Sequence, residues 1–311
     1  MKSQTVTSKD QRLTQNEHNE AEAFDRIAQQ FDKASLRTSD WTFSRYRKAT
    51  CGEPIFDTYP DLVFAFIGRH FLRVNEPRKP LKGVRVLDLG AGEGSWSVIL
   101  AEQGAQLTSL EISPMQVALA RERMRIHNLS WDARVGSAYD LCETFPHGSY
   151  DLIFGLAVLH HLTQDLQRVY LSISSLLREG GYAVFSEPFA GSPFLRSLRE
   201  RLSWILPLDR ESPDERPLNP AEIALLNKYF SRVELDRSDF LAKFARRIFR
   251  SSDLERILSR LDRRLLHVPF VHRIIDILPG LEVFERAIQF SFQGLICEER
   301  AECRIAGQLN A

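Results

Sequence analysis

The sequence has few cysteines, no long apolar run and no excess of charge of either sign. Its four cysteines lie far apart and form no C-x-x-C pair, so we expect neither a disulfide framework nor a zinc site of that kind. No stretch approaches the roughly 18 consecutive apolar residues that predict a membrane-spanning helix. Basic and acidic residues number 41 each, which argues against a dedicated nucleic-acid-binding protein.

The amino-terminal residues lack an apolar segment as well. Residues 1–20 are polar and carry charges of both signs, so we expect a disordered tail and no signal peptide. Together with the isolated cysteines, this pattern predicts a cytoplasmic protein. Hydrophobic residues nevertheless make up 43% of the 311-residue chain, which is enough for a folded core.

Two kinds of hydrophobic periodicity divide the rest of the chain. Helical spacing begins near Ala21, and we expect residues 21–80 to form a helical extension or lid. From Val84 onward, strand patterns alternate with helical patterns, which predicts a parallel sheet with right-handed crossovers. The expected strands cover 84–89, 107–111, a segment ending at 135, 150–155, 182–186, 232–235 and 288–297.

We therefore predict an α/β fold with a doubly wound, Rossmann-like sheet of seven strands, mixed because the last strand is antiparallel. Residues 81–190 would form the ligand-binding core, and residues 191–311 would complete the sheet. A helical insertion is expected at about 240–285, between the last two strands.

A glycine-rich turn is the sharpest local signal. The run Val-Leu-Asp-Leu-Gly-Ala-Gly-Glu-Gly, residues 86–94, joins a buried strand to a helix, where glycine allows unusual φ angles and close contact of a ligand with the backbone. Glu111 ends the next strand 21 positions after Gly90, and a carboxylate there can accept both hydroxyls of a ribose. Asp88 places a second carboxylate just before the turn.

This run resembles the class I S-adenosylmethionine-dependent methyltransferases, over residues 84–190 and more weakly over 219–298. The resemblance implies that the turn packs against the methionine part of S-adenosylmethionine, that Glu111 binds its ribose, and that Asp88 either holds its ammonium group or braces the turn. Ser137 stands where the family often has an aspartate that contacts the adenine amine. The cofactor-binding residues implied are Asp88, Gly90, Ala91, Gly92, Gly94, Glu111, Ile112, Ser137, Ala138 and Leu156.

Candidate catalytic residues follow the fourth and fifth strands. His160 and His161 come just after the fourth strand, and an imidazole can take the proton of a hydroxyl acceptor near neutral pH. Glu187 comes directly after the fifth strand, so it could orient a histidine or bind substrate. O-methyltransferases that resemble this chain carry a histidine pair and an acidic residue at corresponding places. One histidine of such a pair often only caps or packs the following helix.

The predicted activity is methyl transfer from S-adenosylmethionine to the oxygen of a sizeable, partly apolar small molecule. Transfer to carbon, as in quinone biosynthesis, non-methyl chemistry such as cyclisation, and a non-catalytic binding role stay open. We expect no metal, because the spacing contains no E-x-x-H or H-x-E cluster. Residues 241–264 hold eight basic and three acidic residues, and contact with a membrane surface is a less favoured alternative to a solvated face.

Overall fold

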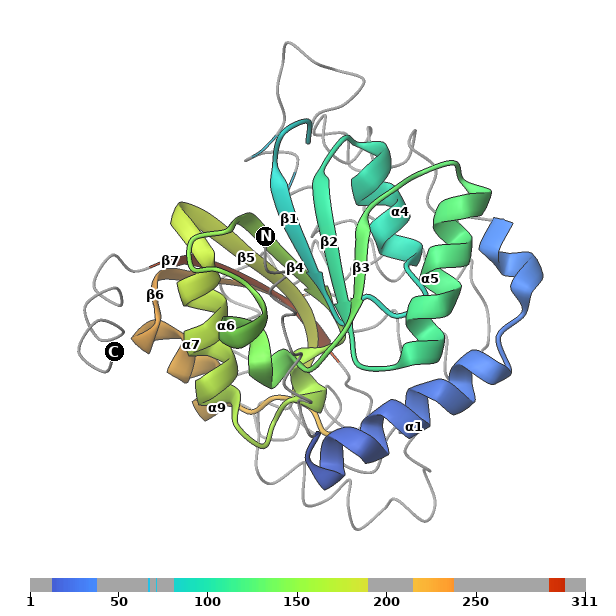
Figure 1. Ribbon diagram of the computed structural model, residues 1–311. Helices are drawn as coiled ribbons and strands as arrows, with labels where there is room; N and C mark the ends of the chain where they lie inside the picture. Colours follow the sequence, from blue (N-terminus) through green and yellow to red (C-terminus); the bar gives the residue numbers. More distant parts are fainter. Residues whose placement is uncertain are drawn as a thin grey trace, which may run out of the picture.

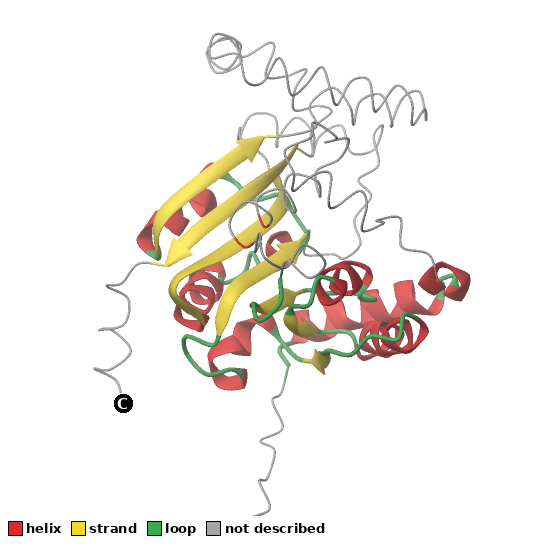
Figure 2. Cartoon of the chain, turned by 90° about the horizontal axis from the view of Figure 1, so that it is seen from above, coloured by secondary structure: helices red, strands yellow, loops and turns green. Residues whose placement is uncertain are grey.

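The structure is a computed structural model that describes residues 13–37, Ile67, Phe71, 81–189, 215–237 and 291–299 (Figure 1). Within this part of the chain, helices cover both faces of one twisted sheet (Figure 2). The predicted α/β class, with strands alternating with helices in a five-stranded parallel sheet, is confirmed.

The strand order is β3-β2-β1-β4-β5-β7-β6, and β7 runs antiparallel to both of its neighbours. The chain order reverses between β1 and β4, which is where ligands bind in sheets of this kind, at the carboxyl ends of the strands. The strands are β1 (Arg85–Leu89), β2 (Gln106–Glu111), β3 (Asp132–Val135), β4 (Tyr150–Leu156), β5 (Leu177–Phe189), β6 (Phe230–Arg237) and β7 (Ser291–Glu299).

The helices alternate with these strands along the chain. Short 3-10 turns, η1 to η4, fill several of the connections between them. The α-helices are α1 (Gln15–Gln29), α4 (Ser95–Glu102), α5 (Pro114–Ile126), α6 (Leu141–Thr144), α7 (Leu166–Leu176) and α9 (Pro220–Leu225), and the 3-10 turns are η1 (Lys33–Arg37), η2 (Ala138–Asp140), η3 (Leu159–His161) and η4 (Leu226–Lys228).

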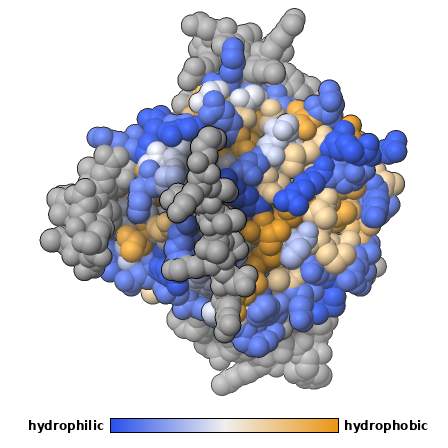
Figure 3. All heavy atoms as spheres, viewed as in Figure 1, coloured by the Kyte–Doolittle hydropathy of each residue, from blue (hydrophilic) through white to orange (hydrophobic). Residues whose placement is uncertain are grey.

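Each face of the sheet carries its own apolar core. In β1, Val86 packs on the side of α4 and α5, whereas Leu87 and Leu89 pack on the side of α7 and α9. All three side chains are almost completely buried, as expected for a central parallel strand covered on both faces. On the face viewed in Figure 1, apolar side chains gather inside a surround of polar ones (Figure 3).

Helix α1 lies across the carboxyl-end side of the sheet and packs along α5 (Figure 1). Ala28 and Leu36 contact Leu119 of α5 in a small separate core. Asp25 adds a polar attachment, since its Oδ1 accepts hydrogen bonds from Ser113 Oγ at 2.5 Å and from the Met115 N–H at 3.1 Å. Helix α1 is therefore fixed to the amino-terminal end of α5.

Two expectations from the sequence need correction. Residues 15–20, expected in a disordered tail, form the first turns of α1, which a capping box between Thr14 and Glu17 begins. The fifth strand begins at Leu177, five residues earlier than expected, and the register shifts between Tyr150 and Leu152 opposite it.

Parts of the prediction lie outside the described residues. These parts are the basic segment 241–264, the insertion at about 240–285, and most of residues 38–80. Of residues 38–80, the structure describes Ile67 and Phe71, two helical residues that pack in the core beside α4 and α5. None of the helices that the structure describes combines the length and the apolar composition needed to cross a membrane.

We expect Asp25→Ala to loosen α1, because the N–H of Met115 and the hydroxyl of Ser113 lose their common acceptor. Hydrogen exchange of the α1 amides should report a local opening easier by roughly 1–2 kcal/mol. Glu22→Ala is the matched control, since Glu22 is an exposed residue of the same helix. Equal exchange in both variants would contradict this attachment.

Candidate functional site

A cavity of about 290 Å³ lies at the carboxyl ends of the parallel strands. Its wall combines residues from α1, from the turn after β1, from the ends of β2 and β3, and from the segment after β4. These are the positions at which the sequence predicted a ligand. Phe24 and Ile27 of α1 belong to the expected extension or lid, whereas Asn16, Glu17 and Glu20 come from residues that were expected in a disordered tail.

The glycine turn forms one wall of the cavity. Gly90 has φ +67°, and a Cβ there would lie 2.5 Å from Cγ2 of Val158, so the turn packs directly on the segment after β4. Gly92 has φ +53° and open space where a Cβ would point. Both glycines line the cavity, as predicted, and they leave backbone within reach of a ligand.

Glu111 lines the cavity and is buried. Its Oε2 accepts a hydrogen bond from the Gly92 N–H at 3.0 Å, and its Oε1 accepts one from the Ser113 N–H at 2.9 Å. Burial raises the pKa of Glu111, and the backbone hydrogen bonds and the nearby His161 oppose this rise. Each oxygen keeps a second acceptor position, so the carboxylate can still take the two hydroxyls of a ribose.

Asp88 lies behind the glycine turn and is not among the described residues that line the cavity. It is 2% exposed and accepts a hydrogen bond from Ser97 Oγ at 2.5 Å, which ties β1 to the first turn of α4. Burial raises the pKa of Asp88 to about 7, and the charges of Glu111 and Glu93 add to this rise against the Ser97 bond. The geometry supports the bracing role, the second of the two roles considered for this residue.

The other predicted cofactor residues divide into two groups. Ile112, Ser137, Ala138 and Leu156 line the cavity, whereas Ala91 and Gly94 are not part of its described wall. Gly94 instead forms the N-cap of α4 with φ +79°, and a Cβ there would meet Ala120 and Trp131 at 3.0 and 3.2 Å. Ala91 and Gly94 thus belong to the turn but do not face the cavity.

A carboxylate stands beside Ser137 although this position is not acidic. The Ser137 hydroxyl donates a hydrogen bond to Glu17 of α1, and both residues line the cavity. Burial alone would raise the pKa of Glu17, but hydrogen bonds from Ser137 and Thr14 outweigh it and hold the pKa below its usual value. Glu17 is therefore a buried, ionised carboxylate at the end of β3.

His160, one of the two candidate bases, is buried away from the cavity. Its Nδ1 lies 2.8 Å from Glu187 Oε2, and its Nε2 lies 3.5 Å from Glu215 Oε1. Burial would lower the pKa of His160, but the hydrogen bonds and charges of the two glutamates raise it to about 9. The imidazole is thus protonated near neutral pH, so it is a poor general base there.

Glu187 anchors the segment that follows β4. Its carboxylate accepts the N–H groups of Val158 and Leu159 at 2.9 Å and of His160 at 3.3 Å. The preceding residue, Ala157, has φ +57°, which an alanine rarely adopts. Glu187 is 1% exposed and belongs to none of the described cavity wall, so it holds the chain in position and does not face a substrate.

His161 is the histidine of the pair that lines the cavity. Its Nδ1 lies 3.4 Å from Oε2 of Glu20 on α1, and Phe24 packs edge-on against its ring at 5.3 Å between centroids. The His160 ring also packs against it, 4.1 Å away between centroids. The sequence could not choose between the two histidines, and the structure places His161, but not His160, in the described wall of the cavity.

Three side chains with metal-ligating atoms also converge here, which sequence spacing did not reveal. One ligand atom from each of His160, His161 and Glu215 lies within 4.8 Å of the others. However, both ring nitrogens of His160 already face carboxylates, so a cation would have to displace a proton that two glutamates hold. We interpret the cluster as a buried, charge-balanced network.

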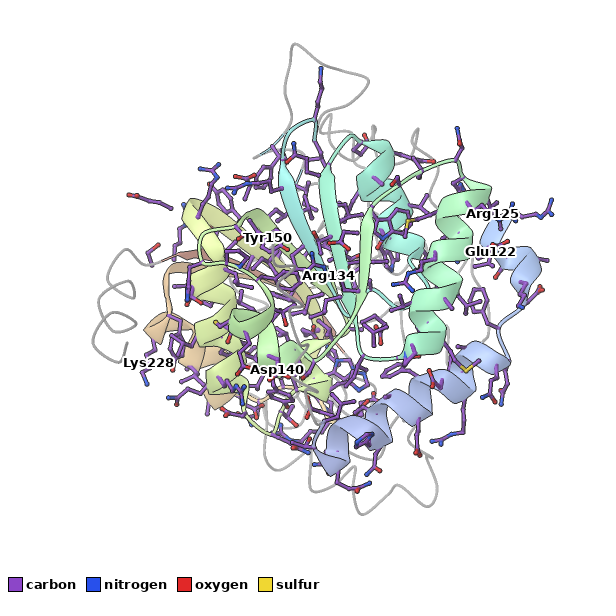
Figure 4. The ribbon with its side chains drawn as sticks, in the orientation of Figure 1. Glu122, Arg125, Arg134, Asp140, Tyr150 and Lys228 are labelled. Atoms are coloured by element: carbon purple, nitrogen blue, oxygen red, sulfur yellow. The ribbon has the colours of Figure 1, made fainter. Side chains whose placement is uncertain are left out.

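Exposed ion pairs elsewhere on the molecule provide a contrast. Glu122 and Arg125 lie together on the outer face of α5, with Oε1 and Nη2 2.6 Å apart (Figure 4). Their side chains are 42% and 72% exposed, so water competes for both charges and the pair adds little stability. The charged groups around His160 are buried, so water screens their interactions less than those of the exposed pair.

Glu17, Glu20 and Glu215 are the residues that sequence analysis missed. The first two were assigned to a tail, although Thr14-Gln-Asn-Glu17 has the spacing of a capping box and marks the start of a helix. No local sequence pattern predicts the contact of Glu215 with His160, because this contact depends on the path of the chain between β5 and β6.

The raised pKa of His160 gives the fold a specific pH dependence. A histidine with a pKa of 6.5 when unfolded and about 9 when folded adds stability that is full below pH 6.5 and is lost as the pH rises through 9. Urea unfolding from pH 6 to 9.5 should therefore show a decline in the wild type that His160→Asn lacks. His18→Asn, at an exposed position of α1, should keep the wild-type profile. Parallel profiles for all three proteins would contradict the buried ion-paired state.

Comparison with known proteins agrees with this geometry. Residues 86–181 match the family model described as a methyltransferase domain. A ubiquinone biosynthesis O-methyltransferase of Xanthomonas campestris is 36% identical over 104 residues, which are 33% of this chain and 43% of that protein. A demethylmenaquinone methyltransferase of Tropheryma whipplei is 30% identical over 190 residues, covering 59% of this chain and 65% of that protein. The chain thus spans less than two thirds of the length of these relatives.

The fold is also similar to a solved structure. A phosphoethanolamine N-methyltransferase 2 of Haemonchus contortus, in complex with S-adenosyl-L-methionine, has a TM-score of 0.52 and 17% identity. The match covers 90% of this chain and 60% of that one. At this identity the likeness concerns the fold alone. The matched family model, the relatives, the glycine turn and Glu111 all indicate one family. The chain carries a methyltransferase domain of the class I, S-adenosylmethionine-dependent type.

Proposed function

We propose that the chain is an S-adenosylmethionine-dependent methyltransferase that methylates an oxygen of a small-molecule acceptor, with His161 as the general base. One observation carries the proposal. The glycine turn, the carboxylate of Glu111 and the imidazole of His161 line the same cavity. A cofactor bound at the glycine turn and a methyl acceptor beside His161 would thus share one cavity.

The residues present fit the cofactor. Glu111 keeps free acceptor positions for ribose hydroxyls, and Gly92 leaves open space beside the backbone. Ile112, Ala138 and Leu156 offer apolar contacts. Asp88 acts from behind the turn through Ser97. When bound, S-adenosylmethionine supplies a methyl group on a positively charged sulfur, which keeps the electron pair of the broken carbon–sulfur bond.

His161 is the residue that we expect to take the proton from the acceptor hydroxyl. His160 is already protonated near neutral pH, because Glu187 and Glu215 raise its pKa to about 9. His161 lines the cavity, and Nδ1 is its ring nitrogen nearest Glu20, so Nε2 is the nitrogen that we assign to the acceptor. The protonated imidazole can then pass the proton to water when the product leaves.

The acceptor that we propose is a phenol or hydroquinone with an apolar substituent. Phe24, Ile27 and Leu162 give the cavity an apolar side next to His161. The names of the relatives, ubiquinone biosynthesis O-methyltransferase and demethylmenaquinone methyltransferase, support a quinone precursor. The second of these has the longer alignment, and on that observation transfer to carbon is the second candidate. A cytoplasmic location stays a prediction.

The roof over the acceptor is proposed to come from the segments 188–218 and 240–285. The described ends of the first segment support its part in this role. The Leu218 N–H donates to the Pro188 carbonyl at 3.0 Å, and Glu215 reaches His160. The returning chain therefore runs close to the segment after β4. Residues 21–80 keep their proposed role as a lid, which the position of α1 supports.

The test of the function uses methyl-labelled S-adenosylmethionine with two phenolic probes, 4-tert-butylcatechol and 1,4-dihydroxynaphthalene. Label in an ether product supports transfer to oxygen, and label on a ring carbon supports the second candidate. Binding of S-adenosylhomocysteine without transfer to either probe would point to a different acceptor. Absence of S-adenosylhomocysteine binding would refute the proposal itself.

Replacing Glu111 should weaken cofactor binding more than it weakens the fold. Glu111→Ala removes hydrogen bonds from a charged acceptor, each worth roughly 1.5–3 kcal/mol, so calorimetry should show at least a tenfold loss of S-adenosylhomocysteine affinity. Glu93→Ala is the control, because Glu93 also lines the cavity. Unchanged affinity in Glu111→Ala would refute the ribose assignment.

Replacing His161 should remove proton transfer and leave cofactor binding intact. His161→Ala is expected to lower kcat by about 10²–10⁴-fold, the range typical of a lost general base. EDTA should leave the wild-type rate unchanged, since both ring nitrogens of His160 are held by carboxylates. Near-full turnover in His161→Ala would exclude the base role, and a rate that returns only with added Zn²⁺ or Mg²⁺ would favour a metal at the cluster.

A further inference from the structure

The pocket histidine has a carboxylate partner on α1, and not on the strand where the sequence led us to expect one. Glu187, the expected partner, is committed to His160 and to the backbone of residues 158–160. Glu20 approaches His161 instead, with Oε2 3.4 Å from Nδ1. Glu20 is 8% exposed, so water screens this pair only weakly.

We propose that Glu20 is the positioning residue of the base: it fixes the orientation and tautomer of His161, so that the acid–base pair is complete only while α1 lies over the cavity. This inference rests on the proposed methyl transfer. Nδ1 is the ring nitrogen nearest Glu20, and a proton on Nδ1 leaves the lone pair on Nε2, which then accepts the acceptor's proton. The carboxylate then balances the charge of the imidazolium that forms.

The packing around His161 supports this geometry. Phe24 lies one helical turn after Glu20 and meets the His161 ring edge-on, so two side chains of α1 hold the ring from the same side. The His160 ring also packs against it, with 4.1 Å between centroids. These contacts restrict rotation of the imidazole, and on this proposal Glu20 decides which nitrogen faces the cavity.

Three acidic residues of α1 each reach the end of a different strand. Glu17 accepts from Ser137 after β3, Glu20 faces His161 after β4, and Asp25 accepts from Ser113 after β2. The same helix thus covers the cavity and carries the partner of the base. Detachment of α1 would open the cavity and disable His161 in one step, which would prevent proton transfer in an open site.

The charged groups that face His161 come from several elements. Glu20 lies on α1, Glu111 ends β2, His160 precedes it in η3, and Glu215 returns from the chain after β5. Removing Glu20 leaves the other three in place. The effect of Glu20 can therefore be measured as a difference between variants that share the remaining charges.

The test compares Glu20→Gln, which keeps the size and removes the charge, with Glu20→Asp, which keeps a charge on a shorter side chain. Glu22→Ala, at an exposed position of the same helix, is the control. With 4-tert-butylcatechol as the probe acceptor, Glu20→Gln should lower kcat roughly 10–100-fold. Glu20→Asp should recover part of the rate, and KM for the methyl donor should stay unchanged.

A readout without turnover separates this inference from the proposed function. In ¹⁵N-histidine spectra of the complex with S-adenosylhomocysteine, the His161 signals, assigned with His161→Gln, should show Nδ1–H in the wild type and a mixture of tautomers in Glu20→Gln. Unchanged tautomer and unchanged kcat in Glu20→Gln would overturn the inference. So would a loss of kcat that matches a loss of S-adenosylhomocysteine affinity, because that result would mean that Glu20 only closes the cavity. If the spectra change but neither probe is methylated, the pairing stands and the acceptor class in the proposed function is wrong.

Discussion

The buried carboxylate of Glu187 is the constraint on which the site depends. It gathers three consecutive backbone N–H groups and the Nδ1 of His160 at the point where the chain leaves β4. A carboxylate in an apolar core is stable only when its hydrogen bonds are satisfied, so the turn after β4 has little freedom to change. The left-handed Ala157 begins this turn, and Val158 packs against Gly90 within it. One interaction thus positions the glycine turn and both histidines.

The same constraint places the two histidines in different surroundings. His160 faces inward to Glu187 and Glu215 and holds a proton, whereas His161, the next residue, faces the cavity and α1. Neighbouring residues in a 3-10 turn point in different directions, and this difference in direction becomes a difference in role. Helix α1 then adds a second layer, since its acidic residues meet the ends of β2, β3 and β4.

Much of the core could be predicted from sequence, because parallel strands buried on both faces leave an unmistakable pattern. The strands at 84–89 and 107–111, the glycine turn and Glu111 all lie close to where they were expected. The separate roles of the residues within the site could not be predicted. Asp88 and Glu187 are carboxylates at strand ends, and only the packing reveals that both point away from the cavity. Glu20 reaches His161 across 141 positions of sequence, and no local periodicity encodes such a contact.

A crystal structure of the full chain with S-adenosylhomocysteine would test the cofactor assignment most directly. We expect the ribose hydroxyls on the carboxylate of Glu111 and the homocysteine along Gly90 and Gly92. The sulfur should lie on the side of the cavity that His161 lines, with α1 in place above it. A ligand bound outside this cavity, or a ribose with no contact to Glu111, would contradict the central claim.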